Sequence, residues 1–253
     1  MDIATIIGLI VGISAVIIAF LMEGGHLSAL FHIPALILVV FGTIGAATVT
    51  TSIRTVLNVP ALLRVAFTDH SEDLIALINK IVSLAEKARR EGILGLEDNI
   101  AREKNPVFKK AVQLVIDGTE ATLFRNIIET EIAYISQRHG AGILFFQKLG
   151  GFSPTLGIVG TVLGLIHALS QIEDASKIAV AIAGAFVATL WGISLANLCY
   201  LPIADKLRFN HQEETKQLEL ILEGMLSIQS GENPKFIRNK LLSYITPQKR
   251  NEL

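Results

Sequence analysis

Charge is what this sequence has least of. Charged residues make up 18% of its 253 residues, against about 25% in a typical soluble domain. Hydrophobic residues make up 51%, and the mean hydropathy is +0.53. This composition argues against a soluble globular domain and against a disordered chain. The net charge of −1 also leaves no basic field that could attract nucleic acid.

Cysteine and recognisable catalytic motifs are also scarce. The single cysteine, Cys199, excludes an internal disulfide and any zinc or iron–sulfur site built from cysteines. We interpret it and the lone Trp191 as packing residues. The sequence has no paired carboxylates, nucleophile elbow, phosphate loop or metal-ligand cluster. We therefore expect no enzyme activity, no cofactor and no metal ion.

Four long stretches contain no Asp, Glu, Lys or Arg. They are Ile3–Met22, Ile33–Ile53, Leu149–Ile172 and Ile178–Ala204. Each reaches the roughly 20 residues that a helix needs to cross the hydrocarbon core, and in lipid the backbone must satisfy its own hydrogen bonds. No basic residue precedes the first stretch, so we expect a retained helix there and not a signal peptide. The sequence predicts an all-α polytopic membrane protein with four transmembrane helices and a helical cytoplasmic domain.

Basic residues predict the orientation. Of the 22 Lys and Arg residues, 21 lie in residues 54–148 and 205–253, and basic segments stay in the cytoplasm. Both termini are then cytoplasmic, and the outer loops are very short. The expected domains are two spans in residues 1–53, a cytoplasmic helical domain in 54–148, two spans in 149–204, and a cytoplasmic helix and tail in 205–253.

The cytoplasmic segments show helix boundaries and no convincing β-alternation. Asp69 and Glu72 have the spacing of a capping box. Gly92 is expected to end the helix that follows, Asn105-Pro106 to start another, and Asp117-Gly118 to form a turn.

Two further helices are expected in the cytoplasmic segments. Thr122–Gln137 carries isoleucines at helical spacing, and Asp205–Gln229 resembles an extension of the fourth span into water. We expect the last twenty residues to be loosely held.

Small residues line one face of the third span and one face of the fourth, with steps of three and four. They are Pro154, Gly157, Thr161, Gly164 and Ala168, and then Ala185, Thr189, Gly192 and Ala196. Helix packing explains the glycines and alanines. Thr161 and Thr189 could line a path, or they could bond a carbonyl of the preceding turn. Only His167 could titrate inside a span, so a cation would need a carboxylate from another chain.

Two prolines and one group of charges allow both a simple and a functional interpretation. Pro154 and Pro202 fall at similar depths on the cytoplasmic side, where each favours a kink. They are either static kinks or a joint between the membrane helices and the cytoplasmic domain. Arg89, Arg90 and Glu97 are either a solvated surface or a patch for a contact that forms and breaks repeatedly.

Three motifs together resemble the MotA/PomA family of flagellar motor stator proteins, and the resemblance extends from the start of the chain to about Met225. They are Gly150–Val162, Ala188–Gly192 continued by Leu201–Leu207, and Arg89–Glu97 in the pattern Arg-x-x-Gly-x-Leu-x-Leu-Glu.

The resemblance implies a subunit of an ion channel in the bacterial cytoplasmic membrane, with no nucleic-acid partner. It implies a ring of five copies around a MotB dimer, which supplies the titrating aspartate. Ion flux turns this ring against the rotor protein FliG. The residue roles that it implies are rotor contact for Arg89 (or Arg90) and Glu97, coupling for Pro154 and Pro202, and a place near the ion path for Thr161 and Thr189.

Two questions stay open. Thr161 stands where proton-driven members of the family often carry alanine, which favours sodium without fixing the ion. The alternative function is a proton-motive-force energiser of the ExbB/TolQ type. That family has three spans, so four spans and the Arg89–Glu97 segment argue against it.

Overall fold

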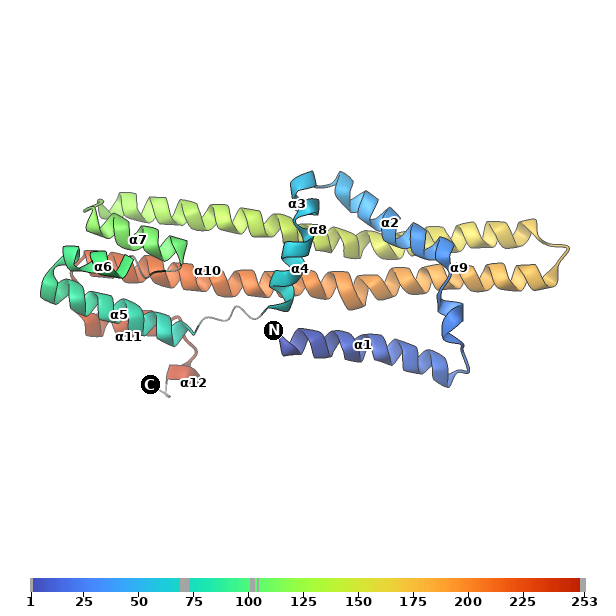
Figure 1. Cartoon of the computed structure of the whole chain (residues 1–253), viewed down its shortest axis with the longest axis horizontal. Coiled ribbons are helices and arrows are strands. Elements are labelled where there is room, and N and C mark those ends of the chain that lie inside the picture. The colour runs from blue at the N-terminus through green and yellow to red at the C-terminus, as the bar shows by residue number, and fades with distance from the viewer. Residues whose placement is uncertain (1, 69–72, 101–102, 104, 251–253) are drawn as a thin grey trace. The chain divides into compact units, whose positions relative to one another are not determined.

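The computed structural model is helical and has no strand in residues 2–68, 73–100, 103 and 105–250, which are the residues it describes (Figure 1). The predicted all-α class is therefore confirmed for this part of the chain. The chain divides into two compact units. The first unit comprises residues 1–69 and 139–209, and the second comprises residues 70–138 and 210–253.

The first unit is built around apolar helices. It contains α1 (Ile3–Met22), η1 (Leu27–Leu30), α2 (Ile33–Val49), α3 (Ile53–Leu57), α4 (Val59–Phe67), the second part of α8 (Ala121–Ser170), α9 (Ala175–Leu195), the π-helical turn η3 (Ala196–Tyr200) and the start of α10 (Leu201–Gln229). Its core joins Phe146 and Leu149 of α8 to Ile203 and Leu207 of α10.

Among the residues that the structure describes, three helices are long and apolar enough to cross a membrane, namely Ile3–Met22, Ala121–Ser170 and Ala175–Gln229. The second predicted stretch, Ile33–Ile53, forms the shorter apolar helix α2. This helix ends at Val49, before three consecutive hydroxyl residues, and the Ser52 side chain then caps α3. Short hydroxyl side chains compete for backbone hydrogen bonds, which explains why the helix ends before Ile53.

The second unit is a helical bundle. It contains α5 (Leu74–Glu91), η2 (Ile93–Leu96), α6 (Glu97–Ile100), α7 (Pro106–Ile116), the first part of α8, the last part of α10, α11 (Pro234–Leu242) and α12 (Pro247–Arg250). Its core is formed by fully buried aliphatic and aromatic residues, among them Ile81, Phe108, Phe124 and Met225.

Three of the predicted helix boundaries in the second unit are confirmed. Gly92 ends α5 with a φ of 78°, and the Asn105 side chain accepts hydrogen bonds from the first turn of α7. Gly118 turns the chain with a φ of 69°. Asp69 and Glu72, the predicted capping box, lie outside the described residues. Asp73 caps α5 instead, by accepting the amide of Ile75.

Helix α8 is longer than the sequence indicates. The segments Thr122–Gln137 and Leu149–Ile172 were expected as separate helices, but α8 runs unbroken from Ala121 to Ser170. Glycines between them do not interrupt it. A methyl group on Gly142 would lie 2.9 Å from Leu62, so close packing against α4 explains this glycine.

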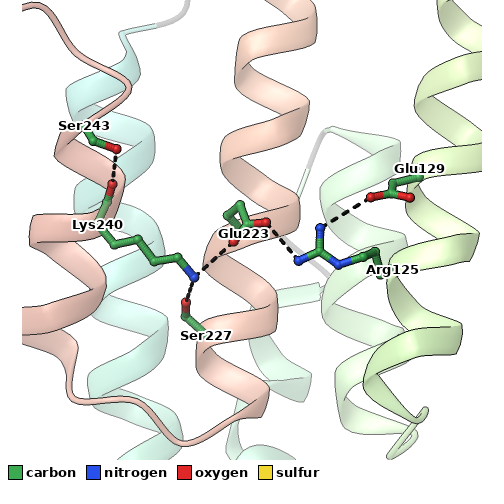
Figure 2. Close-up of polar contacts among 6 residues, drawn as sticks. All are labelled: Arg125, Glu129, Glu223, Ser227, Lys240 and Ser243. Carbon is green, nitrogen blue, oxygen red and sulfur yellow. Dashed lines mark hydrogen bonds and ion pairs between the residues drawn. The ribbon is translucent and has the colours of Figure 1, made fainter.

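The C-terminal tail packs on the second unit as far as Ile245, so the expectation of a loose tail is wrong for residues 234–245. Ile237, Leu241 and Ile245 recur every four residues and are buried in the core of the second unit. Lys240 of α11 also pairs with Glu223 of α10 at 3.0 Å, and Arg125 of α8 pairs with the same carboxylate at 3.0 Å (Figure 2). The tail could not be assigned from local sequence because its partners lie on distant helices.

Candidate functional site

Helices α8 and α9 approach to backbone contact along the predicted small faces. We call this contact the α8–α9 seam, formed by Ser153, Gly157, Thr161 and Gly164 of α8 and by Ala185, Ala188, Thr189 and Gly192 of α9. A methyl group on Gly157 would lie 3.0 Å from the Ala188 carbonyl oxygen. One on Gly192 would lie 2.7 Å from the Ser153 carbonyl oxygen. Small residues are therefore required here to let the backbones meet.

The two predicted threonine hydroxyls meet inside the seam. Thr161 and Thr189 are hydrogen-bonded to each other through Oγ1. Thr161 Oγ1 also lies 3.1 Å from the carbonyl oxygens of Gly157 and Ala185. The bond to the preceding turn and the meeting of the two threonines therefore coexist. Each hydroxyl has one proton, so this cluster of four oxygens retains free lone pairs.

Ser153 is a polar residue of the seam that the sequence analysis missed. Its Oγ donates to the carbonyl of Gly192 at 2.9 Å, and its side chain is fully buried. Ser153, Gly157 and Thr161 are spaced by four residues, so the helical period was a signal that could have found it. This bond links the two helices one residue before Pro154.

The two prolines lie beside one contact between α8 and α10. Pro154 lies inside α8 and cannot donate to the carbonyl of Gly150 one turn earlier. Gly150 packs so closely on Leu201 that a methyl group there would overlap its side chain. Pro202 follows Leu201, directly after the π-helical turn η3. That turn accommodates the proline ring. The sequence predicted a kink here and did not predict a π-helical turn.

Trp191 makes a hydrogen bond in addition to its packing contacts. Its indole Nε1 donates to the carbonyl of Leu30 at 2.7 Å, which joins the α1–α2 connection to α9. The His32 ring packs closely against Gly184, because a methyl group added to Gly184 would lie 2.9 Å from the ring. Trp side chains often combine an apolar body with one such polar contact. The packing role predicted for Trp191 is therefore incomplete. Cys199, the other predicted packing residue, is half-buried in η3.

An ion pair fastens the start of α1. The Asp2 carboxylate bonds Lys206 of α10 and accepts the Thr5 hydroxyl at 2.5 Å. The Asp2 amide also donates to the carbonyl of Phe67 at 3.0 Å. The hydrogen bond from Lys206 is the largest cause that lowers the pKa of Asp2 to about 2. Asp2 therefore stays ionised and holds the start of α1 against the α10 segment that contains Pro202 and Lys206.

The charged residues Arg89, Arg90 and Glu97 lie on one exposed segment of the second unit. Both arginines are in the last turn of α5, and Glu97 begins α6. The η2 turn between them is anchored by the buried Leu96. We call Arg89, Arg90 and Glu97 the charged patch, since all three side chains are exposed.

A partly buried charge network stabilises the same unit. Burial raises the pKa of Glu223, but hydrogen bonds from Lys240 and Arg125 outweigh it and leave the pKa below its usual value. Figure 2 shows that Glu223 joins three helices, because Arg125 belongs to α8 and Lys240 to α11. Lys240 also donates to Ser227 Oγ at 3.1 Å. The network holds the tail and explains why a carboxylate is tolerated there.

Known proteins match both this fold and most of the chain. Residues 99–220 match the MotA/TolQ/ExbB proton channel family, and residues 6–92 match the N-terminal region of motility protein A. Motility protein A of Bacillus subtilis is 36% identical over 99% of this chain and 93% of its own. Chemotaxis protein PomA of Vibrio alginolyticus is 35% identical over 99% of this chain and 98% of its own.

A solved structure has a similar fold along nearly the whole chain. A chain of the flagellar MotAB stator complex from Bacillus subtilis superimposes with a TM-score of 0.92, at 35% identity, over 98% of this chain and 97% of that one. The family is one of channels and not of enzymes. This chain therefore belongs to the motility protein A family of flagellar stator subunits, a multi-pass membrane branch of the MotA/TolQ/ExbB proton channel family.

Proposed function

We propose that this chain conducts ions only together with a MotB-type partner, and that the flux turns the rotor. The observation that carries the proposal is the combination of an uncharged membrane region with a hydroxyl-lined seam. None of the four apolar stretches contains Asp, Glu, Lys or Arg, yet Thr161 and Thr189 meet between α8 and α9. A partner carboxylate would supply the titrating group, as intramembrane ionisable residues do in ion pathways.

The proposed topology has four spans, with both termini in the cytoplasm of the bacterium. Helix α2 has 17 residues, which gives about 26 Å at 1.5 Å per residue. That length lies at the lower limit for crossing the hydrocarbon core. The concentration of basic residues in segments 54–148 and 205–253 supports placing both in the cytoplasm.

The proposed ion path passes the threonine pair. The four oxygens at Thr161, Thr189, Gly157 and Ala185 could replace part of the hydration shell of a cation, as carbonyl oxygens do in selectivity filters. A proton needs no such shell, so the hydroxyl at position 161 supports sodium. Swimming speed measured against external sodium at constant pH tests the choice, because a flat response supports protons.

The proposed motor is a ring of five copies around a MotB dimer, embedded in the inner-membrane lipid. Its charged patch would contact FliG, and Pro154 and Pro202 would couple ion passage to movement. The close packing of Gly150 on Leu201 supports coupling, because a change at one proline would be transmitted to the helix that carries the other.

A charge reversal tests the rotor contact. Glu97→Lys is expected to abolish swimming while MotB still co-purifies, because it places a repulsive charge in the patch. Glu219→Lys makes the same change at another exposed glutamate of the second unit and should leave swimming intact. Normal swimming of the Glu97→Lys strain would contradict the proposal, and so would paralysis of both strains.

A further inference from the structure

An exposed leucine lies inside the segment that carries the charged patch. Leu94 is 71% exposed, although it belongs to the η2 turn, whose Leu96 is fully buried and whose Ile93 packs against the core. Single exposed leucines are common on protein surfaces and need no explanation by themselves. The position of Leu94 within the patch distinguishes it from them.

Charges of both signs flank Leu94 in the chain. Arg89 and Arg90 precede it in the last turn of α5, and Glu97 follows it at the start of α6. Asp98, the next residue, lies 4.0 Å from Lys87. An apolar side chain with charged residues on either side has the arrangement of an interface anchor with its polar rim.

The turn that presents Leu94 is tightly built. Gly92 adopts a φ of 78°, which side chains other than glycine rarely tolerate. A methyl group on Gly95 would lie 2.8 Å from Glu91 Cβ, so the turn closes on the end of α5. A turn fixed at both ends presents Leu94 with little conformational entropy to lose on binding.

Charges alone are a weak basis for a contact that transmits force. Exposed ion pairs add little affinity, and their main effect is on the rate and specificity of encounter. Seating one leucine in an apolar pocket tightens association by about 10- to 100-fold. An anchor of this kind would resist displacement while the surrounding charges select the partner.

We propose that Leu94 is the apolar anchor of the rotor contact. The Leu94 side chain occupies a shallow apolar pocket on the rotor protein. Beside this pocket the rotor protein carries an acidic group opposite Arg89 and Arg90 and a basic group opposite Glu97. The inference deepens the proposed function and rests on its rotor contact. It adds that the contact has an apolar centre, which the charge pattern does not imply.

Binding of the purified rotor protein to the full stator complex in detergent tests this proposal. Leu94→Ala should weaken binding about 10- to 100-fold at both low and high salt, because burial of apolar surface is not screened. Leu94→Met should restore most of the affinity. Arg90→Ala should instead weaken binding mainly at low salt. Ion conduction and thermal stability should be unchanged in Leu94→Ala, since the side chain is exposed.

Leu123→Ala is the matched control, because Leu123 is a leucine of the same unit with 52% exposure. Binding of Leu94→Ala within two-fold of wild type would overturn the anchor, as would an equal loss in Leu123→Ala. If Glu97→Lys also binds normally, the rotor contact of the proposed function fails as well. Loss at Glu97→Lys without loss at Leu94→Ala removes only the anchor.

Discussion

Adding one methyl group to the α8–α9 seam should damage this protein more than adding one a few residues away. In Gly192→Ala the new methyl would lie 2.7 Å from the Ser153 carbonyl oxygen and 2.9 Å from Gly157 Cα. Both are backbone atoms, which cannot rotate aside, so the helices must separate. In Gly151→Ala nothing lies within 4 Å of the new methyl. Both changes replace a helical glycine by alanine, so helix propensity cancels between them.

The magnitude follows from two contributions. Overpacking of a tight contact costs about 1–3 kcal/mol. Separation of the helices also weakens the buried bond from Ser153 to the Gly192 carbonyl, which contributes about 1 kcal/mol. The expected difference between the variants is about 2–4 kcal/mol, or ~5–15 °C in Tm for a chain of this size.

Thermal unfolding of the two purified variants, each with its MotB partner, measures this difference directly. Swimming of the corresponding strains gives the functional readout, and only Gly192→Ala should be impaired. Equal Tm values and equal swimming would refute the close approach of α8 and α9 on which the proposed ion path depends.

Four further outcomes are expected. Pro202→Ala restores an amide donor next to the π-helical turn and should stop rotation with MotB still bound in a co-purification assay. Thr161→Ala should raise the sodium concentration that half-maximal swimming speed requires; an unchanged curve would exclude a ligand role. Glu223→Gln leaves two cations without their shared carboxylate and should lower the free energy of unfolding by about 1–2 kcal/mol, seen as a lower Tm, with swimming retained at moderate temperature. The low pKa of Asp2 means that its contribution to the free energy of unfolding is complete above about pH 4 and is lost as the pH falls towards 2. Asp2→Asn should therefore flatten the change in Tm between pH 5 and pH 2.5, and an unchanged slope would show that the Lys206 pair is not stabilising.

Local signals in the sequence predicted most helix boundaries. Gly92 and Gly118 turn the chain because each adopts a positive φ, and Asn105 caps α7 through its own side chain. Each of these effects depends on a few neighbouring residues, which the sequence displays directly. The charge-free stretches are equally local, so the apolar helices were also predicted.

Features that join distant residues could not be predicted. The bond from Trp191 to Leu30 links positions 161 residues apart, and no sequence pattern marks it. The tail is held by α5 and by Glu223, so its aliphatic spacing gains meaning only when the partners are in place. The continuity of α8 through Gly142 likewise depends on tertiary packing against Leu62, which overrides the weak helix preference of glycine.

The threonine pair lies between these cases. Spacing placed Thr161 and Thr189 each on the small-residue face of its own helix, but it could not decide whether the two hydroxyls meet. The structure shows that they do, and that Ser153 extends the same face. Their role in ion passage remains a prediction, since it depends on an ion and a partner chain.

This chain forms the frame of a channel whose titrating carboxylate, we propose, belongs to another protein. Voltage-driven cation current across vesicles containing the purified chain, measured with and without co-purified MotB, tests it directly. We predict no current above that of empty vesicles for the chain alone and a current once MotB is present. An equal current from the chain alone would contradict the account.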